Sequence, residues 1–421
     1  MADRFREFDW AATPLGPVER WPESWRHAVN IILDSSFPTA LALGSELVYF
    51  YNDAFIPLAG PSRHPLGLGT PVPVAWKEIW PTILAHRFEY VLSTGMPTFE
   101  ADMLLPLERS GYLEETFVTF SFAALRDAHN KPSGIFCTAI ETTARVIADR
   151  QLVCLRALAA QGSLAETPEA ACQGAVTALE ANPRDVPFAL LYLVDKGGKR
   201  ARLAATVGLG SIPDSVPALV DLAGGTDPWM LRTVATARVP VPIDAVQGLI
   251  AAGLRVGEVV PQHAVALPIA RRGDAGLAGI LVAGANPMRP LEESRTFHTL
   301  IAGHLETAVS NAEAKQFERE RTEALAELDQ AKTIFFSNIS HELRTPLTLL
   351  LAPLDEVLSG NKLDSSDREG LELARRGGGR LQKLVNSLLE FSRIEAGRTE
   401  AAYEPIDLAA LTTDLDRKSV V

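Results

Sequence analysis

Residues 337–346, Ser-Asn-Ile-Ser-His-Glu-Leu-Arg-Thr-Pro, constrain this chain more than any other segment of its sequence. At about 100° per residue, a helix through them gathers five apolar side chains on one stripe about 80° wide. The stripe consists of Phe336, Ile339, Leu343, Leu347 and Leu350. His341 falls about 200° from Ile339, and Thr345 shares its outward face at i+4. The pattern predicts a helix that buries the stripe and leaves the histidine in solvent.

An exposed imidazole beside a carboxylate is suited to nucleophilic chemistry. Neutral imidazole, whose ordinary pKa is about 6.5, can attack the γ-phosphate of ATP in line. An adjacent carboxylate can accept the other ring proton, which makes Glu342 the candidate general base. The alternative is an ordinary surface histidine, with Glu342 and Thr345 serving only to solvate the helix.

Two segments resemble two-component sensor histidine kinases. Residues 336–348, Phe-Ser-Asn-Ile-Ser-His-Glu-Leu-Arg-Thr-Pro-Leu-Thr, resemble the phosphoacceptor motif, and residues 381–397 resemble the second helix of the same dimerisation domain. The resemblance implies that His341 is the phosphoacceptor and that Thr345 orients a water for dephosphorylation. It also implies transfer of the phosphate to an aspartate in the receiver domain of a response regulator.

The composition is that of a cytosolic signalling protein. The 421 residues are enough for about three domains. A net charge of −12 argues against a nucleic-acid surface. No apolar run reaches the roughly 18 residues of a membrane span, and the N-terminus has no signal-peptide core. Cys137, Cys154 and Cys172 form no metal or disulfide pattern. We therefore predict a cytoplasmic protein with reduced cysteines, no membrane span, no nucleic-acid partner and no metal site.

Residues 1–146 predict a first sensory domain. Residues 47–55 read as a strand entering a helix, with Asn52 or Asp53 able to cap that helix. Strands are expected at 116–122 and 135–140, on either side of a turn. This order resembles a PAS domain with a tryptophan-containing N-terminal extension. The sequence does not identify a sensory ligand, and Cys137 is expected to be inert in a core strand.

Residues 150–312 predict a second sensory domain. One helix is expected over 151–181, followed by strands at 188–194, 201–208, 264–270 and 276–284. A further helix is expected from 291 to 314. The order resembles a GAF domain. Cys154 and Cys172 both fall in the first predicted helix, which argues against either of them anchoring a bilin.

The remaining chain is predicted to be helical. Residues 313–334 form a coiled-coil signalling helix, on the 4-3-4 spacing of Ala324, Leu328, Ala331 and Phe335. Residues 335–397 form the dimerisation and phosphoacceptor domain, an antiparallel hairpin that pairs with a second copy as a four-helix bundle. The predicted fold is therefore an α+β multidomain homodimer. Three glycines at 377–379 cost helix stability and predict a weak point or a bend.

Residues 398–421 resemble the lead-in to the ATP-binding domain of the kinase family. About 24 residues cannot form a nucleotide site, so we expect a truncated histidine kinase. ATP and Mg²⁺ are expected for the full-length enzyme and not for this chain alone. The alternative is a non-catalytic dimeric PAS–GAF sensor, or a phosphotransfer adaptor that another kinase phosphorylates in trans.

Overall fold

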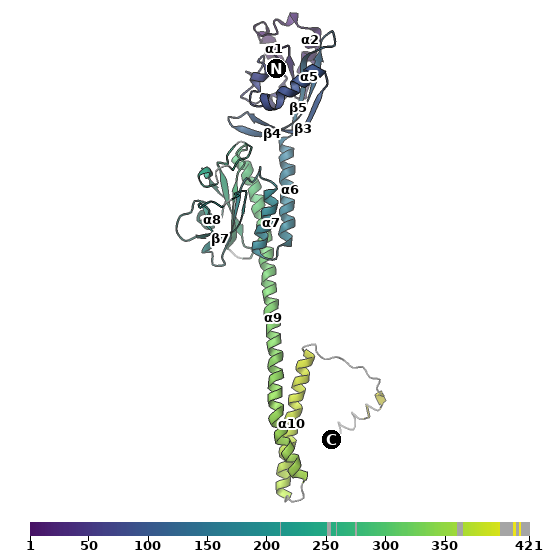
Figure 1. Cartoon of the computed structure of the whole chain (residues 1–421), viewed down its shortest axis with the longest axis vertical. Helices are drawn as coiled ribbons and strands as arrows, with labels where there is room; N and C mark the ends of the chain where they lie inside the picture. The colour runs from purple at the N-terminus through teal and green to yellow at the C-terminus, as the bar shows by residue number, and fades with distance from the viewer. Residues whose placement is uncertain are drawn as a thin grey trace. The chain divides into compact units, whose positions relative to one another are not determined.

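The computed structural model describes residues 1–210, 212–250, 254–257, 259–273, 276–359, 365–395, 407–409 and 412–413. The chain divides into two compact units, Met1–Gln316 and Phe317–Val421, which are described separately. Figure 1 gives the element labels used below. Among the described residues, no helix combines the length and apolar character that a membrane crossing needs.

The first unit begins with a five-stranded antiparallel sheet in the order β2-β1-β5-β4-β3. Its strands are β1 Thr39–Leu43, β2 Val48–Tyr51, β3 Thr98–Glu108, β4 Leu113–Arg126 and β5 Pro132–Glu141. Its helices are α1 Ala2–Glu7, α2 Glu23–Asp34, α3 Ile56–Ala59, α4 Val72–Ala75 and α5 Ala85–Thr94. Short helical turns are η1 Trp10–Ala12, η2 Val18–Arg20, η3 Asp53–Phe55 and η4 Trp80–Leu84.

Local sequence explains how this sheet is joined to its helices. After β2, the Asn52 side chain accepts a hydrogen bond from the Phe55 amide at 3.1 Å, so it caps η3 as its residue type predicts. In the N-terminal extension, Trp10 and Trp21 are buried, and their indole nitrogens donate to backbone carbonyls. The extension therefore packs against the sheet as part of the same apolar core.

A second antiparallel sheet follows in the same unit, with six strands in the order β8-β7-β6-β11-β10-β9. Its strands are β6 Ala189–Val194, β7 Arg200–Val207, β8 Leu219–Asp221, β9 Val241–Ile243, β10 Ala264–Ala270 and β11 Leu277–Gly284. Its helical elements are α6 Thr143–Leu164, α7 Pro168–Glu180, α8 Leu231–Ala237 and η5 Val246–Gly248. Apolar clusters cover both faces of the sheet, and the start of α9 contributes to one of them.

The single helix predicted over 151–181 is wrong. The chain forms two helices, because α6 ends at Leu164 and α7 begins at Pro168. Thr167 caps α7, and its hydroxyl accepts from the Ala170 amide at 3.2 Å. Proline is preferred in the first turn of a helix and disfavours helix in the residue before it, so the Thr-Pro pair starts a new helix. Cys154 and Cys172 consequently lie on different helices.

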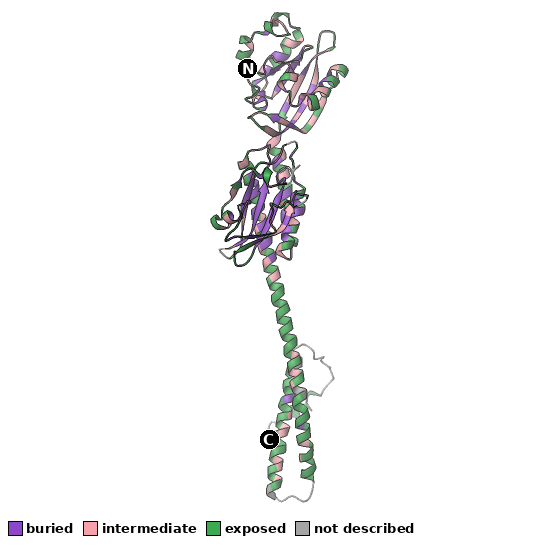
Figure 2. Ribbon diagram, turned by 60° about the vertical axis from the view of Figure 1, so that its left-hand side comes forward, coloured by how far each residue is buried: buried purple, intermediate pink, exposed green. Residues whose placement is uncertain are grey.

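The second unit is a helical hairpin. The helix α9 runs over Leu291–Ser359 and passes through Pro346 and Pro353, and the unit takes it from Phe317 onward. The returning helix is α10, Ser365–Glu395. Residues 360–364, between the two helices, lie outside the described residues. Figure 2 shows that most of this hairpin is exposed in the single chain.

Candidate functional site

The predicted phosphoacceptor segment lies inside α9, in the second unit. The backbone at His341 is helical, but its side chain lies outside the described part of the chain, so its outward orientation stays a prediction. Glu342 and Thr345, the predicted base and water-orienting residue, are both exposed on this helix. Their i+1 and i+4 spacing from the histidine is therefore kept in an unbroken helical backbone.

Contacts with α10 hold the hairpin together close to His341. The Arg344 guanidinium donates from Nη2 to the Asn386 amide oxygen at 3.4 Å. Among the described residues near this bond, Leu347 of α9 and Val385 of α10 are buried, each 7% exposed. Within two turns after the histidine, α9 is thus joined to α10 by a hydrogen bond and buries an apolar side chain.

Further along the hairpin, the glycine run brings the two helices together. A Cβ added at Gly378 would lie 2.6 Å from Leu351 Cδ2, whereas one added at Gly377 or Gly379 would meet nothing within 4 Å. Arg375 Nη1 lies 3.6 Å from Asp355 Oδ1 beside this contact. The middle glycine therefore allows a close approach of α10 to α9, and α10 continues through all three positions.

The predicted apolar stripe of α9 is only partly buried in one chain. Leu347 is buried, but Leu343 is 45% exposed and Leu350 is 64% exposed. The side chains turned toward α10 lie on a neighbouring line, with Leu347 followed by half-buried Leu351, Leu354 and Leu358. On α10, apolar side chains at helical spacing are likewise exposed at Leu381, Leu384, Leu388 and Phe391. One hairpin therefore leaves most of both stripes uncovered, because two helices cover only one face of each other, and the predicted pairing with a second copy stays a prediction.

Sequence reasoning missed a buried ionic cluster in the first unit, which joins its two sheet domains. Arg150 of α6 donates to both Glu115 carboxylate oxygens at 2.9 and 3.1 Å, and to both Asp185 oxygens at 2.8 and 2.7 Å. Asn286 donates to Glu115 at 2.9 Å, and Arg289 donates to Asp185 at 3.0 Å. The Glu115 side chain is 0% exposed and that of Asp185 is 1% exposed. Glu115 of the first domain is therefore a buried carboxylate whose hydrogen-bond donors, Arg150 and Asn286, belong to the second domain.

The arginine of this cluster stays charged. Burial works to lower the pKa of the Arg150 guanidinium, but hydrogen bonds and charge from Asp185 and Glu115 raise it well above its ordinary value. The backbone supports the same junction, because the Glu115 amide donates to the Met288 carbonyl at 3.0 Å. No sequence motif signals this cluster, since its hydrogen-bonded partners are up to 171 positions apart.

The cysteines are free thiols in apolar surroundings. Burial raises the pKa of the Cys137 and Cys172 thiols to about 12, and it also raises that of Cys154. Such thiols remain protonated and are poor nucleophiles. Within the described ranges, no three histidine, cysteine or acidic side chains are gathered as metal ligands.

Comparison with known proteins assigns the helical hairpin. Residues 331–397 match the model of the His Kinase A (phospho-acceptor) domain. Over 118 residues the chain is 41% identical to hybrid signal transduction histidine kinase D of Dictyostelium discoideum, covering 28% of this chain and 7% of that protein. Over 132 residues it is 36% identical to sensor histidine kinase TmoS of Ectopseudomonas mendocina, covering 30% and 14%.

A solved structure is similar to the chain at a lower level. The GAF domain of a phosphoenolpyruvate-protein phosphotransferase from Coxiella burnetii covers 40% of this chain and 97% of its own, with 25% identity and a TM-score of 0.30. The histidine kinase matches span less than a sixth of their relatives' lengths. The similarity therefore concerns the segment that contains His341: residues 331–397 match the His Kinase A (phospho-acceptor) domain model and are similar to segments of histidine kinases.

Proposed function

We propose that the chain acts as the sensory and phosphoacceptor part of a sensor histidine kinase. A neutral ring nitrogen of His341 attacks the γ-phosphorus of Mg²⁺-bound ATP, a nitrogen–phosphorus bond forms, and ADP leaves. The Glu342 carboxylate accepts the proton from the other ring nitrogen. The match of the phospho-acceptor model across this segment is the observation that supports the proposal.

The second step of the proposal is transfer to a response regulator. An aspartate carboxylate of a receiver domain attacks the phosphohistidine, an acyl phosphate forms, and His341 is regenerated. Thr345, one turn after the histidine on exposed helix surface, orients a water that hydrolyses the phosphorylated aspartate. The Arg344–Asn386 hydrogen bond and the burial of Leu347 and Val385 support the surface on which the receiver docks.

We further propose that the hairpin works as a homodimeric four-helix bundle. At about 100° per residue, the exposed stripe of α10 is centred roughly 110° from the line that faces α9. The exposed stripe is Leu381, Leu384, Leu388 and Phe391, all at least 43% exposed. Apolar side chains on a second face gain free energy when a partner covers them, at about 25 cal/mol per Å². A second hairpin presents the same stripe and closes a bundle with twofold symmetry.

The first unit supplies the sensory part in this proposal. Its two sheet domains are assigned as PAS and GAF domains, joined through the cluster around Arg150. Three free thiols are compatible with the reducing cytoplasm, where we place the reaction. Cofactor and partner follow from the chemistry: ATP with Mg²⁺ as phosphate donor, and a receiver domain as acceptor.

The decisive experiment measures phosphate incorporation from γ-labelled ATP with Mg²⁺. The purified chain is incubated alone and with an added ATP-binding domain from a histidine kinase. We expect acid-labile, alkali-stable label that passes to a receiver domain. His341→Gln should abolish the label, and His304→Gln, another histidine of α9, should retain it.

The outcomes separate the proposal from its alternative. Label that His341→Gln retains, or that His304→Gln removes, contradicts the assignment of the acceptor. Label supplied only by a complete second kinase, and not by an isolated ATP-binding domain, favours a phosphotransfer adaptor. Sedimentation tests the dimer separately: Leu384→Glu places a charge on the exposed stripe and should give a monomer, whereas Glu372→Lys, on the same helix, should not.

A further inference from the structure

The first sheet domain contains an apolar cavity that phosphotransfer does not use. Its volume is about 60 Å³, measured as the space open to the centre of a water-sized sphere. It lies between the sheet and the helical segments that cover it, and strands β1, β2, β4 and β5 all contribute to its wall. One water needs roughly 10–15 Å³ on this measure. The cavity therefore has room for about four to six waters, which at roughly 30 Å³ each in the liquid is enough for one small ring molecule.

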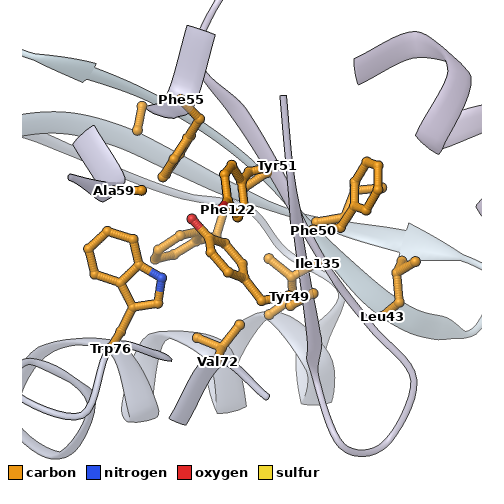
Figure 3. Packing of buried hydrophobic residues seen from close by; sticks show 14 of the residues in the cluster. Leu43, Tyr49, Phe50, Tyr51, Phe55, Ala59, Val72, Trp76, Phe122 and Ile135 are labelled. Carbon is orange, nitrogen blue, oxygen red and sulfur yellow. The ribbon is translucent and has the colours of Figure 1, made fainter. Parts of the chain in front are cut away.

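One polar group in this apolar space has a hydroxyl hydrogen without an acceptor. Tyr49 is 3% exposed, its oxygen faces the indole N–H of Trp76, and among the described residues no acceptor is within hydrogen-bond distance of its hydroxyl. Figure 3 shows Tyr49, Phe55 and Trp76 converging, with ring centroids 6.2 Å and 6.0 Å from that of Tyr49. Burial raises the pKa of the Tyr49 hydroxyl well above its ordinary value, so it stays protonated and can donate.

The neighbouring tyrosine shows that this arrangement is particular to Tyr49. Tyr51 stacks against Tyr49 with centroids 4.9 Å apart, but its hydroxyl lies 3.1 Å from His64 Nδ1. Tyr51 does not line the cavity. A buried hydroxyl hydrogen without an acceptor costs about 1–3 kcal/mol. The position of Tyr49 is therefore unfavourable until a ligand atom accepts a hydrogen bond from its hydroxyl.

The wall of the cavity restricts what that something can be. None of its lining residues, all of which are described, carries a charge, and the Cys137 thiol is held protonated. A carboxylate or an amine would therefore be buried without a counter-ion. A single water would also be poorly held, because a buried water needs two to four polar partners. An uncharged molecule with an apolar body and one acceptor satisfies both conditions.

We propose that this cavity binds a small uncharged molecule, about the size of one six-membered ring, whose single oxygen accepts a hydrogen bond from the Tyr49 hydroxyl. A cyclic or short-chain ketone has this chemistry. The volume is too small for a haem or a flavin. The inference concerns binding alone and stands apart from phosphorylation of His341.

The test titrates the full chain with three ligands of similar ring size, followed by saturation-transfer NMR. Cyclohexanone carries the acceptor, methylenecyclohexane has the same shape without it, and cyclohexanecarboxylate adds a charge. We expect saturable binding of the ketone, weaker binding of the hydrocarbon and no binding of the carboxylate. Tyr49→Phe should weaken ketone binding roughly fivefold, the effect of one neutral hydrogen bond, without weakening hydrocarbon binding.

Tyr51→Phe is the matched control, because it removes a hydroxyl from the stacked neighbour outside the cavity. It should leave the affinity for all three ligands unchanged. Equal ketone affinity in Tyr49→Phe and the unaltered chain would refute the role of the hydroxyl. Binding of the carboxylate, or saturable binding of neither ring, would refute the cavity as a site for this class of ligand.

Discussion

Replacing Arg150 by methionine tests how strongly the two sheet domains are held together. Methionine keeps much of the side-chain length but removes four hydrogen bonds to carboxylates. Glu115 and Asp185 would then be buried with their shared counter-ion gone. Removing one partner of a buried ion pair typically costs about 3–5 kcal/mol. Because Asn286 and Arg289 still donate to these carboxylates, we expect the lower end, about 3 kcal/mol.

A second variant separates the cost of an unpaired charge from the loss of packing. Glu115→Gln in the Arg150→Met background removes one of the two carboxylates that lost their hydrogen bonds to Arg150. We expect the double variant to recover at least about 1 kcal/mol, because it removes a buried carboxylate whose nearest remaining cation, that of Arg184, lies 3.6 Å away. The two substitutions should therefore be clearly non-additive.

Hydrogen–deuterium exchange measures this effect where it occurs. Opening of the junction exposes the amides at the start of β4, including that of Glu115, which donates to Met288. A loss of about 3 kcal/mol raises their opening equilibrium roughly a hundredfold. Arg145→Met, on the same helix at a pair with an exposed arginine, is the control and should change exchange less than about fivefold. A change below threefold in Arg150→Met, or additive effects in the double variant, would refute the reasoning.

Three further predictions rest on single groups. Burial lowers the pKa of His298 to about 4, so unfolding takes up a proton below about pH 6.5. The free energy of unfolding from circular dichroism melts should therefore fall by roughly 3 kcal/mol between pH 6.5 and 4. His298→Gln should remove this pH dependence. Tyr49→Phe should stabilise the first domain by about 1 kcal/mol against heat, because a buried hydroxyl without a partner is removed; destabilisation would contradict this. Gly377→Ala should stabilise the hairpin by up to about 1 kcal/mol, the difference in helix propensity, and so raise its melting temperature. Gly378→Ala should raise the melting temperature less, because its Cβ would meet Leu351.

The sequence predicts the elements whose signals are local. The strand expected at 264–270 is β10 with the same bounds, because its apolar run ends at a turn. Asn52 caps the turn after β2 because a short amide side chain can accept from an amide three residues on. The break before Pro168 was missed because the alanine-rich pattern continues on both sides of it, although Thr167 and Pro168 together carried the signal.

Contacts between distant residues could not be predicted in the same way. Helical periodicity placed Leu343 and Leu350 on an apolar stripe, but it does not state which partner covers them, and one hairpin leaves both exposed. Glu115 reads as an ordinary polar residue at the start of a strand. Its burial depends on Arg150 and Asn286, which only the tertiary fold brings within 3.1 Å. Helical periodicity identifies which face of an element is apolar, but not which residues pack against that face.

One strand connects the two features of the first unit that carry the strongest constraints. Glu115, at the beginning of β4, is fixed in the ionic cluster, and Phe120 and Phe122 further along β4 line the apolar cavity. Because adjacent positions of a strand cannot move independently of their ladder, a ligand that displaces these rings acts on the strand that holds Glu115. Arg150 lies on α6, the helix that follows the first sheet and packs against α7. The cavity and the second domain are therefore linked through β4 and the residues that bind Glu115, Arg150 and Asn286.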